Sequence, residues 1–284
     1  MPKFAGSQAR AIGAEMRRAR DSLEWTLETL AAATDISRST LSRIETGARR
    51  ADVGEVASIL TALAVTGPAK QRLLRLAGDT SETWVGVGSA VTSQLSAVSS
   101  YEAEAHEIHE FQVSVIPGLL QTASYARALF GSTPLGSAER ERGVFYRVER
   151  QATLRRSTLR SYNAFLDETA LRRKVTTDEK TMSQQFHNLL AVAACPGRSV
   201  RVIPFSAGAY WGCEGPFILY ALNDHHVAYH ENQSSGVFID GEATDVYQQV
   251  LNNLDNVALD QDESNELITS YLKEQDHGLR VPQE

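Results

Sequence analysis

The chain of 284 residues is long enough for about two domains of ordinary size. Hydrophobic residues make up 42% of it and charged residues 22%, as is typical of a protein with a packed core. No apolar run reaches the roughly 18 residues that a membrane span needs, the first residues lack the apolar stretch of a secretory signal, and two cysteines are too few for a disulfide framework. We therefore expect a reduced, cytoplasmic protein without membrane contact, and exclude collagens, coiled-coil rods and disulfide scaffolds.

The net charge of −7 is unevenly distributed. Residues 1–80 hold 12 lysines and arginines against 9 aspartates and glutamates, whereas the remainder holds 16 against 26. A basic first part on an acidic second part favours a first part that binds an anion such as nucleic acid. Ordinary variation in a small domain is the alternative explanation.

The first 80 residues predict five short helices separated by turns of a few residues, and together these make a compact bundle. Ser37 and Asp52 are good N-caps, and Gly47 is suited to end a helix. The expected helices lie at about 8–21, from Thr26 onward, at 38–45, from Val53 to about Gly67, and at 69–77.

Residues 81–100 are rich in serine, threonine and glycine and are expected to form a linker. Gly86 and Gly88 do not make a dinucleotide-binding fingerprint, because a third glycine and a preceding strand are missing.

Residues 101–284 predict a C-terminal domain that is mostly helical and contains a small mixed sheet, so the fold class of the whole chain is α+β. Helices are expected at 101–113, 117–130, 138–159, 242–259 and 263–274. Strands are expected at 162–166, 200–204, 216–222 and 227–230, with a hairpin turn at 223–226. The helical stretch 168–194 between the first two strands predicts a right-handed βαβ crossover.

Residues 26–47 carry the most specific pattern in the chain. Two short helices that cross steeply need a small residue at their contact, a turn residue that tolerates a left-handed backbone, and apolar anchors, and Ala31, Asp35 and Ile36 with Leu41 and Ile44 meet these needs. The second helix then presents an outer face of arginines and short hydroxyl side chains, which suits a DNA major groove. That face comprises Arg38, Ser39, Ser42 and Arg43. The alternative is a solvated helix in a small bundle.

This stretch, and the chain over about residues 10–65, resembles the Cro and phage-repressor (XRE) type of helix-turn-helix regulators. The resemblance implies that Arg20 pairs with Glu45, that the four residues of the outer face contact base edges, and that Arg49 and Arg50 add positive charge toward the DNA backbone. It also implies phosphate contacts by Thr26, Thr40 and Thr46, and Ser37 lies at a helix N-terminus, which favours phosphate. The chain departs from the family at Leu27, where glutamine is usual, and at Asp35, where glycine is usual.

The C-terminal region offers no catalytic constellation and no nucleophile motif, so we expect no enzyme, no cofactor and no metal. Glu102, His106, His109 and Glu110 would share one helical face, for which a solvated surface is a better explanation than a metal site. His225, His226 and His230 would lie on a turn and a strand, where a metal- or pH-sensitive role is a minor alternative. Asp167 and Glu168 are interpreted as helix-capping residues.

The stretch Ile116–Ala128, IPGLLQTASYARA, resembles the hallmark of a C-terminal domain of unknown function that follows a helix-turn-helix in actinobacterial regulators. Further matches extend the resemblance over about residues 90–275, among them RVERQATL at 147–154 and VRVIPF at 200–205. The resemblance implies an antitoxin-like or developmental regulator encoded beside a very small partner protein. A structural explanation of the hallmark is a buried helix start, with Pro117 at its first position and Leu119, Leu120 and Tyr125 in the core.

Together these observations predict a sequence-specific DNA-binding transcriptional regulator. Its domains are expected at 1–80 (DNA binding), 81–100 (linker) and 101–284 (regulation). The partners are double-stranded DNA, a second copy in a homodimer, and a small-molecule effector or small protein bound by the C-terminal domain at residues not identifiable from the sequence. The alternative is an antitoxin-like module that sequesters a small partner and regulates its own operon. An enzyme hidden in the C-terminal domain is a third, weaker hypothesis.

Overall fold

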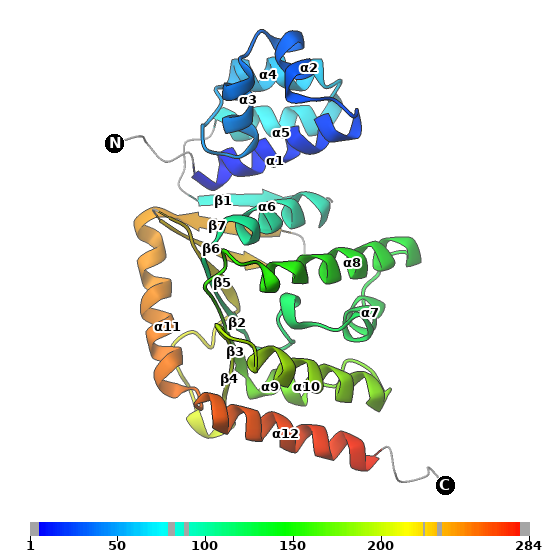
Figure 1. The fold of residues 1–284 in the computed structure, drawn as a ribbon, viewed down its shortest axis with the longest axis vertical. Helices are drawn as coiled ribbons and strands as arrows, with labels where there is room; N and C mark the ends of the chain where they lie inside the picture. Colours follow the sequence, from blue (N-terminus) through cyan, green and yellow to red (C-terminus); the bar gives the residue numbers. More distant parts are fainter. Residues whose placement is uncertain (1–5, 79–82, 88–90, 224, 232–234, 279–284) are drawn as a thin grey trace. The chain divides into compact units, whose positions relative to one another are not determined.

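The computed structural model describes residues 6–78, 83–87, 91–223, 225–231 and 235–278 (Figure 1). The chain divides into two compact units. The first contains residues 1–104 and 225–244, and the second contains residues 105–224 and 245–284. The fold class is α+β, as predicted.

The five predicted N-terminal helices are all present. They are α1 (Gly6–Ser22), α2 (Leu27–Thr34), α3 (Arg38–Glu45), α4 (Val53–Ala62) and α5 (Gly67–Gly78). Three side chains accept hydrogen bonds from backbone N–H groups at helix starts: Thr26 on α2, Ser37 on α3 and Asp52 on α4. Asp35 ends α2 in the left-handed conformation, with φ 57°. The sequence analysis predicted a residue that tolerates this conformation at the turn, and aspartate does so better than most residues.

The core of this bundle is apolar and gathers side chains from all five helices. It includes Ile12, Met16, Leu30, Leu41, Ile44, Val56, Ile59, Leu60, Leu63 and Leu73. Because Leu41 and Ile44 point into this core, the opposite face of α3 is left to solvent.

A buried ion pair joins the first and third helices. Arg20 donates from Nε to Oε1 of Glu45 at 2.7 Å and from Nη2 to Oε2 at 2.9 Å, and from Nη1 to the carbonyl of Trp25 at 2.6 Å. The hydrogen bond to Glu45 raises the pKa of Arg20. The pairing implied by the family resemblance is therefore present, and its two-pronged geometry fixes the orientation of α3 on α1.

The rest of the first unit lies partly in the segment expected to be a linker. Residues 81–100 contain β1 (Thr83–Val87) and the start of α6 (Val91–Glu104), and the unit also holds β6 (His226–Glu231), β7 (Ser235–Asp240) and the short helix η4 (Gly241–Thr244). β1 and β6 both pair antiparallel with β7. A strand and a helix therefore occupy much of the segment that was expected to be a linker. β1 pairs with β7, about 150 positions later in the chain, and local composition does not reveal so distant a partner.

Arg10 of α1 connects the helical bundle to α6. Its buried side chain forms an ion pair with Glu104 and lies over the ring of Tyr101 at 5.1 Å. On its other side Arg10 contacts the turn after α3, where a Cβ added to Gly47 would lie 2.3 Å from Arg10 Cγ. Gly47 has φ 69° and so needs glycine on two counts.

The second unit is built on four strands in the order β5–β2–β3–β4 (Figure 1). These are β2 (Glu107–Gln112), β3 (Ser161–Asp167), β4 (Arg198–Ile203) and β5 (Phe217–Ala221). β2, β3 and β4 run parallel, and β5 pairs antiparallel with β2. The parallel β3–β4 pair confirms the predicted βαβ unit.

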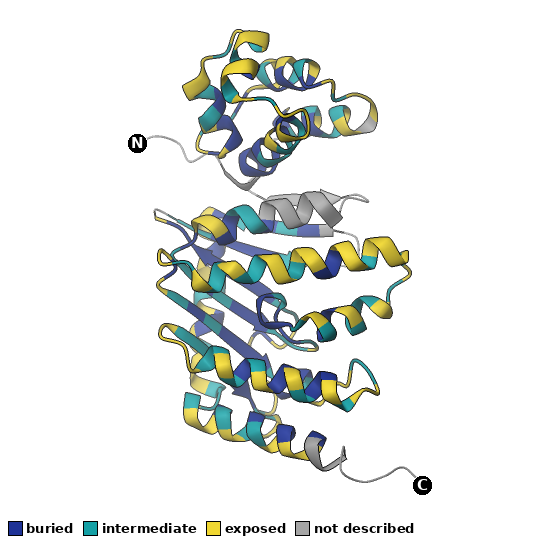
Figure 2. Ribbon diagram, turned by 45° about the vertical axis from the view of Figure 1, so that its right-hand side comes forward, coloured by how far each residue is buried: buried dark blue, intermediate teal, exposed yellow. Residues whose placement is uncertain are grey.

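Helices lie on both faces of these strands, with α11 on one face and α7, α8 and α10 on the other (Figure 1). Figure 2 shows the strands buried while the helices carry exposed residues on their outer sides. The helices are α7 (Ala123–Gly131), α8 (Ser137–Arg150), α9 (Glu168–Arg172), α10 (Glu179–Ala193), α11 (Asp245–Val257) and α12 (Gln261–Gly278), with short helices η1 (Gly118–Leu120), η2 (Gln151–Arg155) and η3 (Phe205–Ala207).

The predicted helix over 101–113 is wrong, because α6 ends at Glu104 and β2 begins at Glu107. Tyr101, Ala105 and Ile108 are all buried and follow the i, i+4, i+7 spacing of a helix, so the pattern crosses an element boundary. β2 is an inner strand between β3 and β5, so its burial does not alternate strictly. The predicted hairpin turn at 223–226 includes Asp224, which lies outside the described residues.

The close approach of α1 to α3 predicts that Gly13→Ala destabilises the bundle. An added Cβ would lie 2.1 Å from the Ile44 carbonyl oxygen, and this contact is backbone that must shift. We expect a loss of about 1–3 kcal/mol in the free energy of unfolding, measured by urea denaturation. Gly54→Ala is the control, since an added Cβ there meets only the Asp52 side chain at 3.1 Å. Equal stability of the two variants would contradict the predicted clash.

The buried ion pair predicts a second difference. Glu45→Ala leaves the Arg20 guanidinium buried without its carboxylate, which should lower stability by about 3–5 kcal/mol. Glu28→Ala removes an exposed carboxylate that pairs with Arg38 at the surface, and should shift the melting temperature far less. Calorimetry of the full chain compares the two, and indistinguishable melting curves would reject a structural role for the Arg20–Glu45 pair.

Candidate nucleic-acid interface

The outer face of α3 gathers the side chains that the sequence predicted to contact base edges. Arg38, Ser39 and Arg43 are exposed and Ser42 is half-buried, while Leu41, Ile44 and Glu45 on the opposite face are buried. The short turn between α2 and α3 is set by Asp35, which ends α2 in the left-handed conformation, and by Ser37, which caps the start of α3 two residues later. The helix-turn-helix geometry is thus built by local sequence signals.

Arg43 is the arginine of this face that is available for a ligand. Within the described part of the chain, its guanidinium makes no hydrogen bond or ion pair. A guanidinium without an internal partner keeps all five donors for a ligand, and its planar fork matches the O6 and N7 acceptors of guanine.

Arg38 has an internal partner that the sequence analysis missed. It forms an ion pair with Glu28 in the first turn of α2, and both side chains are 64% exposed. A hydrogen bond from the backbone N–H of Glu28 itself, together with the nearby Arg38, lowers the pKa of Glu28, so this carboxylate is charged at neutral pH. Contact of Arg38 with DNA therefore has to replace or share this pair.

Thr26 and Ser37, two of the predicted phosphate contacts, are exposed N-caps of α2 and α3. The Thr40 hydroxyl accepts from Ser37 Oγ at 2.9 Å, and Thr46 Oγ1 donates to the Ser42 carbonyl at 2.8 Å. Hydroxyls that keep lone pairs or rotate can still meet a phosphate, and helix N-termini carry N–H groups and a positive dipole end. The structure brings these hydroxyls to the two helix starts and to the end of α3.

Arg49 and Arg50 have partners within the bundle. Arg49 forms a two-pronged pair with Glu55 at 2.9 and 3.0 Å, which raises the pKa of Arg49, and Arg50 donates to the Ala77 carbonyl at 3.1 Å. Both side chains are half-buried. Their expected role toward the DNA backbone stays a prediction, and their contacts within the bundle were not foreseen.

The acidic and histidine residues expected on one helical face do not share a helix. Glu102 belongs to α6, His106 precedes β2, and His109 and Glu110 are neighbours on β2 whose side chains point to opposite faces of the sheet. The solvated-face interpretation is also wrong for the two carboxylates, which are 1% and 2% exposed. Glu110 accepts a hydrogen bond from the Tyr162 hydroxyl at 2.8 Å. The described residues contain no cluster of three or more metal-binding side chains.

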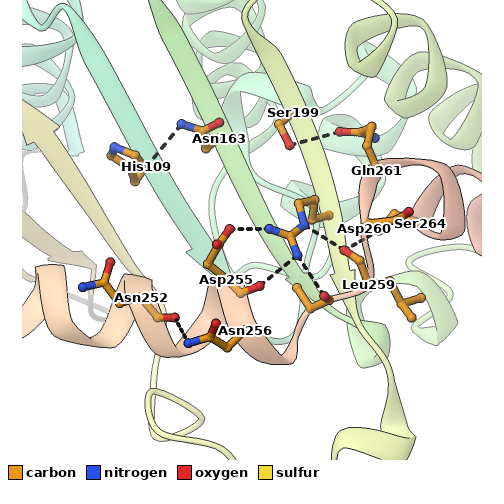
Figure 3. A network of polar contacts seen from close by, with 12 residues as sticks. His109, Asn163, Ser199, Asn252, Asp255, Asn256, Leu259, Asp260, Gln261 and Ser264 are labelled. Atoms are coloured by element: carbon orange, nitrogen blue, oxygen red, sulfur yellow. Dashed lines mark hydrogen bonds and ion pairs between the residues drawn. The ribbon is translucent and has the colours of Figure 1, made fainter.

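His109 instead belongs to a set of polar contacts on the α11 side of the sheet (Figure 3). Asn163 Nδ2 on β3 and His109 Nδ1 on β2 form a hydrogen bond at 3.4 Å. The Ser199 hydroxyl on β4 donates to Oε1 of Gln261 at 3.0 Å. Arg201 donates to three carbonyls at the end of α11, those of Asp255, Ala258 and Leu259, at 2.7 to 2.9 Å. An arginine at a helix C-terminus satisfies carbonyls that have no partner in the helix, so this network joins α11 to β4.

The hallmark stretch at 116–128 is held by buried amides. Gln185 accepts from the Thr122 N–H at 2.8 Å and donates to the Leu120 carbonyl at 2.7 Å, and Gln121 donates to the Ile116 carbonyl at 2.7 Å. Leu119, Leu120 and Tyr125 are buried, as the structural explanation predicts. The α-helix begins at Ala123 after the Thr122 cap rather than at Pro117, because η1 intervenes.

Asp167 caps α9, as predicted, by accepting from the Thr169 N–H at 2.8 Å, and it also accepts from the Tyr210 hydroxyl at 2.6 Å. Burial together with this bond raises the pKa of Tyr210. Glu168 is buried instead and accepts from the Tyr271 hydroxyl and from the Phe205 N–H. The two adjacent carboxylates face different partners and support the fold.

Comparison with protein families matches two parts of the chain. A helix-turn-helix domain model matches residues 11–73, and the model of a domain of unknown function, DUF5753, matches residues 95–270. No relative was found among curated proteins. None of the described helices has the length and apolarity to cross a membrane. The chain thus carries a helix-turn-helix domain of the kind found in DNA-binding regulators, followed by a second matched region that covers more than half of its length, and it belongs to the DUF5753 family.

Proposed function

We propose that the protein is a sequence-specific transcriptional regulator that inserts α3 into the DNA major groove. The observation that carries this proposal is the exposed face of α3, with Arg43 unpaired among the described residues and small hydroxyl side chains beside it. Short side chains let the helix approach the groove floor, and arginine distinguishes guanine by two hydrogen bonds. The proposal assigns the chain no catalytic activity.

Backbone contacts complete the proposed interface. Thr26 and Ser37 lie at the N-termini of α2 and α3, where phosphate oxygens are favoured. Such contacts fix the register of a helix in the groove without carrying sequence information themselves. The basic excess of residues 1–80 supports binding at this end of the chain.

The proposed regulator acts as a homodimer whose C-terminal region binds a small-molecule effector or a small protein. A single helix-turn-helix bundle offers little surface, and two-fold dimers gain affinity by reading two half-sites. An effector changes DNA affinity only through its differential affinity for two states of that dimer.

The role of Arg43 in base reading is tested by substitution. Arg43→Ala should lose about 1–3 kcal/mol of binding free energy on the best site and relax the preference at one base position. Arg43→Lys keeps the charge but loses the fork, so it should lose specificity more than affinity for unrelated DNA. Fluorescence anisotropy with a panel of single-base variants measures both effects. Uniform losses on every sequence for Arg43→Ala would refute base reading by α3.

The function as a whole is tested by selecting binding sites from random duplex DNA with the full chain. We expect enrichment of an inverted repeat with half-sites about one helical turn, roughly 34 Å, apart, and affinity that falls steeply with salt. A protein carrying Arg38→Ala, Ser39→Ala and Arg43→Ala is the control and should enrich no sequence. If the unaltered chain enriched no motif either, the proposal of sequence-specific regulation would fail.

A further inference from the structure

The outer side of α8 carries three large apolar side chains that are exposed to solvent. Phe145 is 64% exposed, Val148 40% and Tyr146 38%, and the rings of Phe145 and Tyr146 lie 6.0 Å apart, edge to face. The inner side of the same helix is packed, because Gly143 and Val144 are buried. Single exposed apolar residues are ordinary, whereas Phe145 and Tyr146 form one patch whose rings touch, and Val148 borders it one turn after Phe145.

Two unpaired charges of opposite sign flank this patch. Arg142 and Glu149 are exposed, and in the described part of the chain neither side chain has a hydrogen bond or an ion pair. The neighbouring Glu141, by contrast, is held by Arg127 at 2.8 and 3.1 Å. Arg142 and Glu149 are equally far from the midpoint between Phe145 and Tyr146, about 5 Å along the helix axis on either side.

We propose that α8 is the surface through which two copies of this chain associate, with the two α8 helices antiparallel about a two-fold axis at that midpoint. In this arrangement Arg142 of each copy faces Glu149 of the other, Phe145 and Tyr146 are buried between the helices, and Val148 lies at the edge of the contact. A two-fold contact requires a patch that is complementary to itself, and opposite charges placed symmetrically about an apolar centre meet this requirement. The biological role of this contact rests on the proposed function, because a regulator that binds two DNA half-sites needs a dimer.

Charge favours a second copy over an unrelated partner. An occupant with a uniform charge would be attracted by one flank of the patch and repelled by the other, whereas a second copy satisfies both flanks. The patch is also small beside the roughly 800 Å² per partner that stable complexes bury. Self-association is therefore weak in free solution and becomes effective when DNA holds two copies side by side, which raises their effective concentration.

Charge reversal provides the test. Arg142→Glu and Glu149→Arg each place like charges opposite one another in both halves of a homodimer, and should weaken self-association of the full chain by about tenfold in sedimentation equilibrium without DNA. A mixture of the two variants restores both ion pairs and should associate as tightly as the unaltered chain. Glu266→Arg and Lys273→Glu, which reverse exposed charges on α12, are the matched controls and should have no effect alone or mixed.

Phe145→Ala gives a second measure, because it removes the centre of the patch without changing its charge, and it should weaken association about tenfold or more. Loss of association in each single variant with recovery in the mixture supports the proposal. A chain that stays monomeric at all concentrations, or a mixture no tighter than its components, overturns it. Because these measurements use no DNA, a positive result beside a failed site selection would overturn the proposed function and leave the α8 dimer standing.

Discussion

The ion pair between Arg20 and Glu45 is the contact on which the orientation of α3 depends. Both charges are buried, so each would be costly without the other, and the two-pronged hydrogen bonding restricts how α3 can rotate on α1. Gly13 allows the helix backbones to approach at the same crossing. With the inner side of α3 fixed by this pair and by apolar contacts, the side chains left on its outer side are determined by helix periodicity alone.

Five arginines of the bundle differ in how far their side chains are engaged by the rest of the protein. Arg20, Arg49 and Arg50 are used in holding elements together, whereas Arg43 has no such task among the described residues. Arg38 is intermediate, since its partner Glu28 is as exposed as Arg38 itself. The Glu28 carboxylate repels phosphate and competes with DNA for Arg38. It would therefore favour those DNA sites whose contacts with Arg38 are stronger than the Arg38–Glu28 ion pair.

The sequence allowed good predictions where structure is encoded locally. Thr26, Ser37 and Asp52 cap helices through their immediate neighbours, so the five N-terminal helices and the face of α3 could be derived from residue spacing. The failures involve distant partners. β1 pairs with residues near 237, and the Arg201 guanidinium reaches carbonyls more than 50 positions away, so neither the strand nor the network could be seen from local patterns. Glu110 was misassigned because a buried carboxylate looks like a surface residue until Tyr162 is placed beside it.

The contacts of Arg10 restrict where domains can be recombined between proteins of this family. Its guanidinium pairs with Glu104, which lies inside the DUF5753 match, while its aliphatic stem lies against Gly47 in the turn that follows α3. A chimera that joined residues 1–80 to a foreign C-terminal region would leave a buried cation without this carboxylate, beside the turn that follows α3. Successful recombination between members of the family would therefore transfer α1 and α6 together, with a crossover point that lies beyond α6 rather than in the segment between the two family matches.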